Sequence, residues 1–447
     1  MLSEPAKFKL MPDFVSFLTN NQFTASLWGD ESFAAVLGQK SIFDIIRIVA
    51  KDTSPPGYYF FLHFWMKIFG SGEVAIRALS FLFFLGLVIT VFFIGKTLFN
   101  TKTGILAALL TFTSQFLFSY GFEGRMYSIL ALFSTLSVYF FIKRNWLWYV
   151  VATTLALYSH HFAIFIVAVE VLWLIPDFIK HPIKTAKPFV AIFILYLPWL
   201  YPLYLQTTKV AGDFWLAKPN LESVTTLFEN FAVGPRGSIL HQPALWLTLL
   251  ILVFRKWKIF GWKDWFLISW VVLPVGLTFA ASYVMKSSIF FDRYMLFIIP
   301  GIMLLIASRP RWSFSQGAVL FLIAIFATLS FNYFTHPTKR PFRQLADFVK
   351  ANRPGDEALI NYAGAAHHLF ESKYYHLDAP IYTPNGKLPF YTGTALMDET
   401  DQIAKLPETK KIGVITSESK EKVKLPGYEL YQSDQFGDLW FLQFVQK

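Results

Sequence analysis

The chain has 447 residues, of which 55% are hydrophobic, 19% aromatic and only 15% charged, and its mean hydropathy is +0.45. These values lie well outside the usage of soluble domains and indicate a protein that crosses a membrane several times. The net charge of +11 does not indicate nucleic-acid binding, because residues 336–447 hold 14 basic and 14 acidic side chains and the whole excess lies in the hydrophobic part. The absence of cysteine excludes disulfides and thiolate metal sites.

The first region, residues 1–73, is expected to form an extracytoplasmic segment. Residues 20–22 are Asn, Asn and Gln where a signal peptide needs an apolar core, so membrane insertion is expected to depend on the first true span. Residues 26–31 read Ser-Leu-Trp-Gly-Asp-Glu and begin a predicted loop. Because a carboxylate at the edge of a bilayer is costly unless it carries chemistry, Asp30 is our candidate for a catalytic base.

Two short helices at the membrane surface are predicted in the rest of this region. Ser41 with Asp44 forms a capping pattern, and the helix that follows carries Asp44, Arg47 and Lys51 on one face and apolar side chains on the other. Pro55 and Pro56 then favour an extended entry followed by a helix start. The aromatic residues of that second helix suit the headgroup level: Tyr58, Tyr59, Phe61, His63, Phe64, Trp65 and Phe69.

The second region, residues 74–334, holds apolar runs that approach the length of about 20 residues needed to cross a hydrocarbon core. Lys and Arg resist translocation. The loops that we place inside hold 13 of these residues, whereas the longer loops on the opposite side hold 7. Asp30 and the tail after residue 335 are therefore expected outside the cytoplasm. The ten predicted spans, several of them short, are 74–98, 103–120, 124–142, 146–160, 161–178, 187–205, 241–254, 262–285, 293–308 and 314–334.

The third region, residues 335–447, is predicted to be a small extracytoplasmic α/β domain. Residues 343–352 have a helical pattern, and residues 358–362, 411–416 and 439–445 have the pattern of strands, with Pro and Gly between them. The tail contains no nucleotide-binding loop and no zinc pattern.

Several short motifs follow one another along the membrane region. They are Ser-Leu-Trp-Gly-Asp-Glu at 26–31, Ser-Pro-Pro-Gly-Tyr-Tyr at 54–59, the stretch 73–77 with Ser80, Glu-Gly-Arg-Met-Tyr at 123–127, Tyr-Ser-His-His-Phe at 158–162, and Arg293-Tyr294. In this order they resemble the family 39 glycosyltransferases of the GT-C superfamily, relatives of protein O-mannosyltransferases and aminoarabinose transferases. The resemblance covers residues 26–308, with a similar tail behind them.

The resemblance implies an α-helical polytopic membrane protein of GT-C type that uses a lipid-linked sugar donor, usually a polyprenyl phosphate sugar. It also implies transfer on the outer face of the membrane with inversion at the anomeric carbon. Two features depart from the family pattern. Family members normally have a span just before the Trp-x-Asp-Glu motif, whereas residues 8–27 here are too polar for one. The usual His before the paired prolines is Ser54 in this chain.

Inverting transfer needs a base that takes the proton from the attacking hydroxyl. Asp30 is the candidate. Glu31 cannot be its local partner in a dyad, because neighbouring residues point in different directions on a helix or a strand. Glu31 is expected to orient the loop of Asp30, to bind the acceptor or to contact a basic residue. The alternative is that both carboxylates only cap a solvated helix.

Cations near the outer ends of spans usually have an anionic partner, and here the donor phosphate would fit that role. Arg293 is the leading candidate because it also belongs to a family motif, and Arg125 and Arg77 are the others. The alternatives are structural: Arg77 pairs with Glu73 four residues earlier, and Arg125 reaches from the interior toward the membrane surface.

The remaining candidates for substrate binding are Glu123, Tyr127, His160 and Tyr58. At helical spacing Glu123 and Tyr127 share one face, so they are expected to line a cleft; the alternative is an ordinary helix start. His160 could donate to phosphate or sugar oxygens, although such residues are more often satisfied structural groups at an interface. Adjacent acids with scattered histidines do not form a ligand set, so we predict no metal and no other cofactor.

The sequence therefore predicts a membrane glycosyltransferase of the cell membrane with an extracytoplasmic site. Its predicted partners are a polyprenyl-phosphate sugar donor, a protein, lipid or glycan acceptor, and membrane lipids, and it is not expected to bind nucleic acid. The alternative is a transporter or flippase of a lipid-linked saccharide, which would place its polar residues near the middle of the bilayer.

Overall fold

The computed structural model describes residues 18–235, 238–254, 260–308, 313–353, 355, 357–362, 367–384 and 386–447, the side chains of 313–315 excepted. The residues that precede 18 lie outside this set. Six of the basic residues that were counted to assign loops to the two sides of the membrane also lie outside it: Arg236, Arg255, Lys256, Lys258, Arg309 and Arg311.

The chain forms two compact units. The membrane unit consists of the described residues within 53–58 and 77–336, together with residues 18 and 19. The tail unit consists of Asn20–Asp52, Tyr59–Ile76 and Pro337–Lys447. The N-terminal segment that carries Asp30 and Glu31 therefore belongs to the same unit as the C-terminal residues, although the long helical region lies between them in the sequence.

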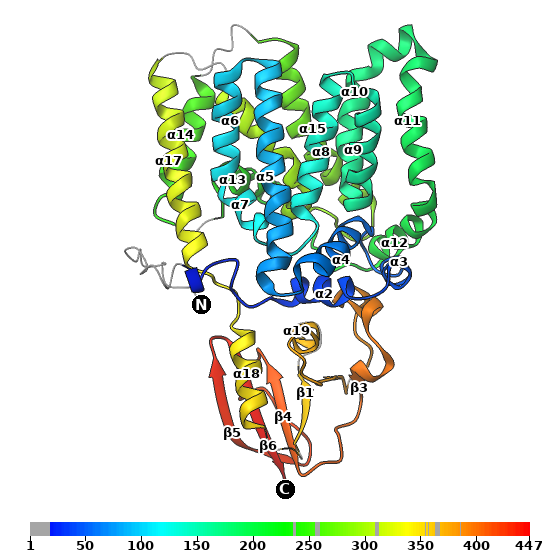
Figure 1. The fold of residues 1–447 in the computed structure, drawn as a ribbon, viewed down its shortest axis with the longest axis vertical. Helices are drawn as coiled ribbons and strands as arrows, with labels where there is room; N and C mark the ends of the chain where they lie inside the picture. The colour runs from blue at the N-terminus through cyan, green and yellow to red at the C-terminus, as the bar shows by residue number, and fades with distance from the viewer. Residues whose placement is uncertain are drawn as a thin grey trace. The chain divides into compact units, whose positions relative to one another are not determined.

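The membrane unit is built from helices, which Figure 1 shows side by side as a bundle. Its α-helices in chain order are α5 (Glu73–Leu98), α6 (Thr101–Thr113), α7 (Gln115–Gly121), α8 (Tyr127–Ile142), α9 (Trp146–Ser159), α10 (Ile164–Lys180), α11 (Pro182–Tyr196), α12 (Leu200–Gly212), α13 (Leu221–Val233), α14 (His241–Val253), α15 (Trp262–Val284), α16 (Ile299–Ala307) and α17 (Ser313–Thr335). Short 3-10 helices connect some of them: η1 (His161–Ala163), η2 (Leu197–Trp199) and η4 (Asp292–Ile298).

Among the described residues, five helical segments are long and apolar enough to cross a membrane, and a bent pair brings the number to six. The bent pair is α6 with α7, which meet at 64°. The bend lies at Ser114, whose ψ of 110° leaves the helical region. The prediction of a multi-pass helical membrane protein is thus confirmed, and the number of ten spans stays a prediction. The five segments are Glu73–Leu98, His161–Lys180, Pro182–Gly212, Trp262–Val284 and Gln316–Thr335.

Small residues allow two helices of the membrane unit to approach closely. A Cβ atom on Gly95 of α5 would lie 2.8 Å from the Cα atom of Gly104 on α6. Close backbone approach of this kind is typical of helices packed in membranes. There is no hydrophobic driving force between such helices, so they associate through van der Waals packing, which small residues allow.

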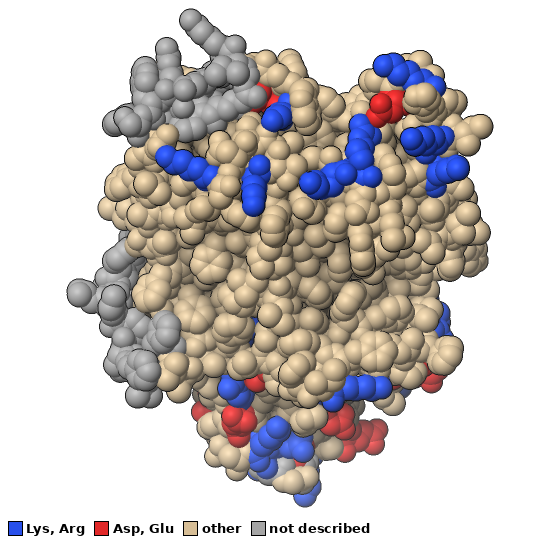
Figure 2. Space-filling view, turned by 45° about the horizontal axis from the view of Figure 1, so that its top comes forward, with Lys and Arg blue, Asp and Glu red and all other residues tan. Residues whose placement is uncertain are grey.

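Basic residues gather where predicted inner ends of helices meet. Lys263 at the start of α15 donates a hydrogen bond to the Leu98 carbonyl oxygen at the end of α5. Arg144 just after α8 forms an ion pair of 2.8 Å with Asp177 near the end of α10. On the face drawn in Figure 2, Lys and Arg residues line one edge of a broad belt with few charged side chains.

The N-terminal part of the tail unit contains the helices α2 (Gly29–Gly38) and α3 (Ile42–Val49) and most of α4 (Gly57–Phe69). The capping pattern predicted for α3 is confirmed, because the Asp44 amide donates to the Ser41 hydroxyl over 3.2 Å. The predicted aromatic belt on α4 is only partly right. Phe64 and Phe69 are exposed, but Tyr59 is buried, and so is His63, whose Nδ1 lies 2.9 Å from the Gly38 carbonyl oxygen.

The placement of Asp30 and Glu31 in a loop was wrong, because both lie in the first turn of helix α2. Trp28 is extended and precedes the helix. Two acidic residues directly after it are favoured by the partial positive charge of the helix N-terminus. The apolar residues that follow, Phe33 to Leu37 except Val36, are buried and hold the helix to the rest of the tail unit.

The C-terminal part of the tail unit is a mixed sheet with helices, as predicted. The strand order is β3-β2-β1-β4-β6-β5. The strands β3, β2, β1 and β4 are parallel, and β6 pairs antiparallel with both β4 and β5. Sequence patterns located α18, β1, β4 and β6 within two residues and missed the others. The elements are α18 (Phe342–Asn352), β1 (Glu357–Asn361), α19 (Leu369–Tyr374), β2 (Ile381–Tyr382), η5 (Phe390–Thr392), η6 (Thr394–Leu396), η7 (Glu399–Asp401), β3 (Gln402–Ile403), β4 (Lys411–Thr416), β5 (Tyr428–Phe436) and β6 (Leu439–Gln446).

Each face of this sheet has its own apolar core. On one face, Leu345 and Val349 of α18 pack with Ile415 and Phe441 of the central strands. On the other, Ile412 and Leu442 belong to a second buried cluster. Because successive side chains of a strand alternate between faces, covering both faces buries nearly every residue of β4 and most of β6.

Candidate active site

Asp30 and Glu31 are neighbours in sequence but differ in environment. The Asp30 side chain is half-buried, whereas Glu31 is 0% exposed. Successive positions of a helix point about 100° apart, so one carboxylate can face outward while the next faces the core. The structure therefore separates two roles: an accessible carboxylate at Asp30 and an internal one at Glu31.

The buried Glu31 carboxylate has a cationic partner from the far end of the chain. Lys339 Nζ donates a hydrogen bond to Glu31 Oε2 over 2.7 Å, and the side chain of Lys339 is 14% exposed. A buried carboxylate is stable only when it is paired in this way. Of the alternatives stated for Glu31, contact with a basic residue is confirmed, and a solvated cap does not describe this residue.

The segment just before Asp30 is also held by C-terminal residues. The Leu27 amide donates to the Tyr375 hydroxyl over 3.0 Å, and that hydroxyl donates to Glu73 Oε1, also over 3.0 Å. Burial and the neighbouring Glu73 carboxylate raise the pKa of Tyr375, so its hydroxyl stays protonated and can donate. Arg343 adds a 3.1 Å ion pair to the same Glu73 oxygen. Glu73 therefore pairs with Arg343.

A further buried carboxylate lies beside the start of α2. A Cβ atom on Gly29 would lie 3.5 Å from Glu371 Oε1, and the same oxygen lies 3.3 Å from His368 Nδ1. Phe370 of the same helix packs edge-on against Phe33 with ring centroids 5.1 Å apart. Helix α19 thus supports the turn that carries Asp30.

We call residues 26–31, which include Asp30 and Glu31, the acidic motif. Sequence reasoning missed three of its neighbours: Lys339, Tyr375 and Glu371. Their local sequence carries no signal for it, since each lies in a stretch that also reads as an ordinary loop or helix. Only the pairing of the two ends of the chain, 308 residues apart for Lys339 and Glu31, brings them together.

In the membrane unit, the proline motif packs against the turn between α9 and η1. A Cβ atom on Gly57 would lie only 2.5 Å from the Tyr158 carbonyl oxygen. Gln206 Nε2 donates to the Ser54 carbonyl oxygen over 3.2 Å, and Gln206 Oε1 lies 2.8 Å from His161 Nε2. Ser54, which stands where the family has His, therefore contributes to this contact through its backbone.

Tyr58 and Arg77 lie in the interior of the membrane unit. Both are 0% exposed. The Tyr58 hydroxyl lies 3.5 Å from Ser80 Oγ, and Ser80 is three residues after Arg77 on helix α5. A buried Tyr usually keeps its hydroxyl bonded in this way. This contact gives Tyr58 a structural partner and places it one helical turn from Arg77.

Arg293 stands among aromatic rings. Its Cζ atom lies 4.6 Å from the ring centroid of Phe291, 5.5 Å from that of Tyr127 and 5.8 Å from that of Tyr294. The rings of Tyr127 and Tyr294 are stacked with their centroids 6.4 Å apart, and the centroid of the His160 ring lies 4.9 Å from that of Tyr294. Aromatic faces attract a guanidinium and fix its plane.

Glu123 and Arg125 join the same neighbourhood from the turn between α7 and α8. His160 is within electrostatic reach of both Arg125 and Arg293, and Tyr120 is within reach of Glu123 and Arg293. Arguing from helical spacing for Glu123 and Tyr127 was wrong, since Glu123 precedes the helix that begins at Tyr127. The structure nevertheless brings together most of the predicted residues of this unit. We call this set the arginine cluster: Glu123, Arg125, Tyr127, His160, Arg293 and Tyr294.

Among the described residues, no three His, Asp or Glu side chains are grouped so that they could hold a metal ion. The acidic motif of the tail unit has Lys339 as a neighbour, and a cation at this position repels a metal ion. We therefore derive no step through a metal.

The chain is similar to known proteins in sequence over part of its length and in fold over most of it. Residues 53–203 match the model of a family described as dolichyl-phosphate-mannose-protein mannosyltransferase. A comparison with curated proteins finds no match. Among solved structures, the chain is similar to ArnT from Cupriavidus metallidurans in the apo state, with 12% identity, a TM-score of 0.62, and coverage of 96% of this chain and 95% of ArnT.

Two further structures contain lipid phosphates. ArnT from the same organism bound to undecaprenyl phosphate matches with 13% identity, 96% coverage of both chains and a TM-score of 0.56. The archaeal oligosaccharyltransferase AglB from Archaeoglobus fulgidus, in complex with an inhibitory peptide and a dolichol-phosphate, matches with 10% identity and a TM-score of 0.51. That match covers 90% of this chain and 68% of AglB.

At these identities the chain shares a fold with the solved structures. The fold is like that of ArnT, a bundle of apolar helices with a small C-terminal α/β domain, which confirms the predicted fold class. The predicted resemblance to GT-C glycosyltransferases is confirmed as well, because the family model and the structural matches agree. The proteins that the chain resembles include mannosyltransferases and an oligosaccharyltransferase, the class of enzyme that the motifs predicted.

Proposed function

We propose that the protein transfers a sugar from a polyprenyl-phosphate-linked donor to an acceptor hydroxyl on the outer face of the membrane, with inversion at the anomeric carbon. The observation that carries this proposal is the half-buried Asp30 at the start of α2, in a chain whose fold matches ArnT along nearly its whole length. The acceptor is a protein, a lipid or a glycan.

In this proposal Asp30 is the general base. It takes the proton from the acceptor hydroxyl as the oxygen attacks the anomeric carbon, while the bond between that carbon and the donor phosphate breaks. A positioned base contributes roughly 10²- to 10⁴-fold to such a reaction. Glu31 keeps helix α2 in place through Lys339, and Tyr375 and Glu371 support the same turn.

The leaving group is a lipid phosphate that gains negative charge in the transition state, so fixed cations stabilise it. We assign this role to Arg293 and Arg125 of the arginine cluster, and a supporting role to Arg77. Planar guanidinium groups suit phosphate because they offer two parallel N–H donors. Tyr127, Tyr58, Glu123 and His160 are assigned to binding the substrate.

The orientation belongs to the proposal as well. The described basic residues counted on the inner side outnumber those on the other side, and the positive-inside rule places the ends that carry Lys263 and Arg144 in the cytoplasm. The acidic motif and the C-terminal domain would then be extracytoplasmic.

The test uses the purified protein in proteoliposomes and a panel of undecaprenyl-phosphate sugars, with release of undecaprenyl phosphate as the readout. Asp30→Asn is expected to lower transfer roughly 10²- to 10⁴-fold while the affinity for undecaprenyl phosphate stays unchanged. Asp347→Asn is the matched control, because Asp347 is exposed on α18. Full transfer by the Asp30 variant would refute the base assignment.

One observation favours the alternative of a transporter. Glu170 is buried midway along the segment His161–Lys180, where the Ser137 and Tyr149 hydroxyls donate to it over 2.7 and 2.9 Å. A polar group at such depth is typical of substrate pathways. The two functions give different results in the proteoliposomes: a flippase moves the labelled donor between leaflets without releasing lipid phosphate, and an enzyme releases it.

A further inference from the structure

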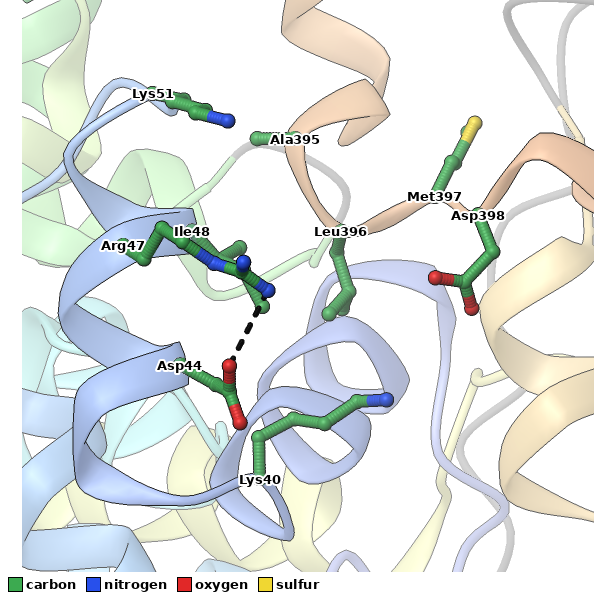
Figure 3. Close-up of a pocket in the computed structure, with 9 residues that line it drawn as sticks. All are labelled: Lys40, Asp44, Arg47, Ile48, Lys51, Ala395, Leu396, Met397 and Asp398. Carbon is green, nitrogen blue, oxygen red and sulfur yellow. Dashed lines mark hydrogen bonds and ion pairs between the residues drawn. The ribbon is translucent and has the colours of Figure 1, made fainter.

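The tail unit contains a pocket of about 390 Å³ between helix α3 and the 3-10 helix η6. Figure 3 shows Lys40, Asp44, Arg47 and Lys51 around it, with Leu396 on the opposite wall. Asp44 and Arg47 lie three residues apart on one side of α3, and Lys40 and Lys51 come from the turns before and after the helix; these four side chains are called the stripe of α3 below. The volume falls within the range of roughly 300–1,000 Å³ that is usual for small-ligand sites.

The charge of the pocket favours an anion. Three of its side chains are cationic, Lys40, Arg47 and Lys51, and two are anionic. Both carboxylates are engaged within the tail unit. Asp44 accepts from Ser41 over 2.7 Å and pairs with Arg47 over 3.2 Å, as the dashed line in Figure 3 marks.

The other carboxylate, Asp398, lies at 3.5 Å from Lys373, a cation outside the pocket. Lys373 also pairs with Asp401 over 2.5 Å, so it is fixed in position. The side chain of Lys40, by contrast, makes no hydrogen bond or ion pair with the residues that the structure describes. A cation in this setting attracts an anionic ligand without first breaking another contact.

Helix α3 also presents an apolar edge beside the pocket. Phe43 is 83% exposed and Ile46 is 38% exposed, and the two lie three residues apart on the same face. Ile45 and Val49 cover the tail unit's interior instead. A helix with a core face, an exposed apolar edge and a basic stripe is typical of elements that lie in the interface of a membrane.

We propose that this pocket binds the phosphate of an anionic membrane phospholipid, while Phe43 and Ile46 enter the acyl boundary next to it. Lys40, Arg47 and Lys51 hold the headgroup, and Ile48 and Leu396 contact its glycerol end. The exposed apolar edge favours a lipid over a free phosphate, because a soluble anion has no apolar part that could contact Phe43 and Ile46. The site belongs to α3 and η6 and does not depend on the proposed transfer reaction.

The experiment uses the full chain, delipidated in a neutral detergent, and measures the rise of the thermal midpoint with dioleoylphosphatidylglycerol, dioleoylphosphatidylcholine or inorganic phosphate. The phosphatidylglycerol is expected to raise the midpoint, and the other two probes are not. The double variant Lys40→Gln with Arg47→Gln is expected to weaken the apparent affinity for phosphatidylglycerol roughly 30-fold, since each basic residue near an anionic lipid strengthens binding by about fivefold.

The control carries the same two chemical changes at exposed positions elsewhere on the tail unit, Lys424→Gln with Arg353→Gln. It should keep the affinity of the unmodified chain, and circular dichroism should show all variants folded. An unchanged affinity in the pocket variant would overturn the proposal. An equal loss in the control would overturn it too, because binding would then depend on net charge alone. Stabilisation by inorganic phosphate equal to that by the lipid would replace the lipid with a free anion.

Discussion

The acidic motif of the tail unit and the arginine cluster of the membrane unit are held by different kinds of contact. The motif is held by single bonds to residues remote in sequence: Lys339 forms an ion pair with Glu31, and the Leu27 amide donates a hydrogen bond to the Tyr375 hydroxyl. Arg293 instead lies among several aromatic rings, each at 4.6 to 5.8 Å. Removing one partner of an ion pair removes its whole stabilising energy. The position of Arg293 instead depends on several ring contacts, so the loss of one ring leaves the others. The motif should therefore be sensitive in stability, and the cluster in ligand affinity.

The largest effect is expected from Lys339→Gln. It takes the lysine away from a Glu31 side chain that is 0% exposed, and breaking a buried ion pair from one side costs about 3–5 kcal/mol. Chemical unfolding of the purified protein in detergent measures this loss. The control is Lys422→Gln, whose ion pair with Glu418 is largely exposed, and which should cost less than about 1 kcal/mol. The comparison fails if the two variants lose the same stability.

Arg293 tests the other side of the comparison. Arg293→Gln is expected to weaken the binding of undecaprenyl phosphate by roughly 1.5–3 kcal/mol, or 10- to 150-fold, with little loss of stability. Arg293→Lys should fall between, since an ammonium keeps the charge but not the plane that lies against Phe291. Arg144→Gln, at an ion pair with Asp177, is the control and should leave the affinity unchanged. Equal affinities for all of these variants would remove Arg293 from the site.

Gly57 tests how tightly the proline motif is packed in the membrane unit. An alanine there would place Cβ 2.5 Å from the Tyr158 carbonyl oxygen. Because this oxygen belongs to the backbone, relieving the clash requires a shift of the main chain. Gly57→Ala should cost about 1–3 kcal/mol of stability. Gly72→Ala meets no atom within 4 Å and should be close to neutral. Thermal unfolding of the two variants side by side decides whether this contact is as close as the structure shows.

The smallest effect is expected from Tyr375→Phe, which removes one hydroxyl from the network between Leu27 and Glu73. Both hydrogen bonds of that hydroxyl are lost, but Glu73 keeps its ion pair with Arg343, so the cost is mainly that of the Leu27 bond, about 0.5–1.5 kcal/mol. Tyr374→Phe removes an exposed hydroxyl that donates to the Ser71 carbonyl oxygen, and it should cost less. If Tyr374→Phe proves the more harmful of the two, the Tyr375 bond does not support the acidic motif.

Local patterns predicted much of the fold. The Ser41 cap, the strands β1, β4 and β6 and helix α18 follow from side-chain periodicity and capping, which depend on residues a few positions apart. Helix α2 was missed because a Trp-Gly pair followed by two acids reads equally well as a loop. Strand β5 was missed because its side chains are mostly exposed, so that it lacks the apolar alternation of a half-buried strand.

The candidate site was predicted in part. The motifs named Asp30, Arg125, Tyr127, His160 and Arg293, and the structure gathers all of these except Asp30 into the arginine cluster of the membrane unit. The partners of the acidic motif could not be found in the same way. Nothing near Lys339 or Tyr375 in the sequence refers to residues 26–31.

The sequence by itself determined that the protein is a multi-pass membrane protein, where its charges concentrate and which residues carry the GT-C motifs, because composition and spacing are written directly in the chain. Only the tertiary structure decided that Glu31 is paired and internal, that Arg293 lies among aromatic rings and that the stripe of α3 faces a pocket. These properties depend on which distant segments pack together, and packing is set by shape and burial across the whole fold, which no local pattern encodes.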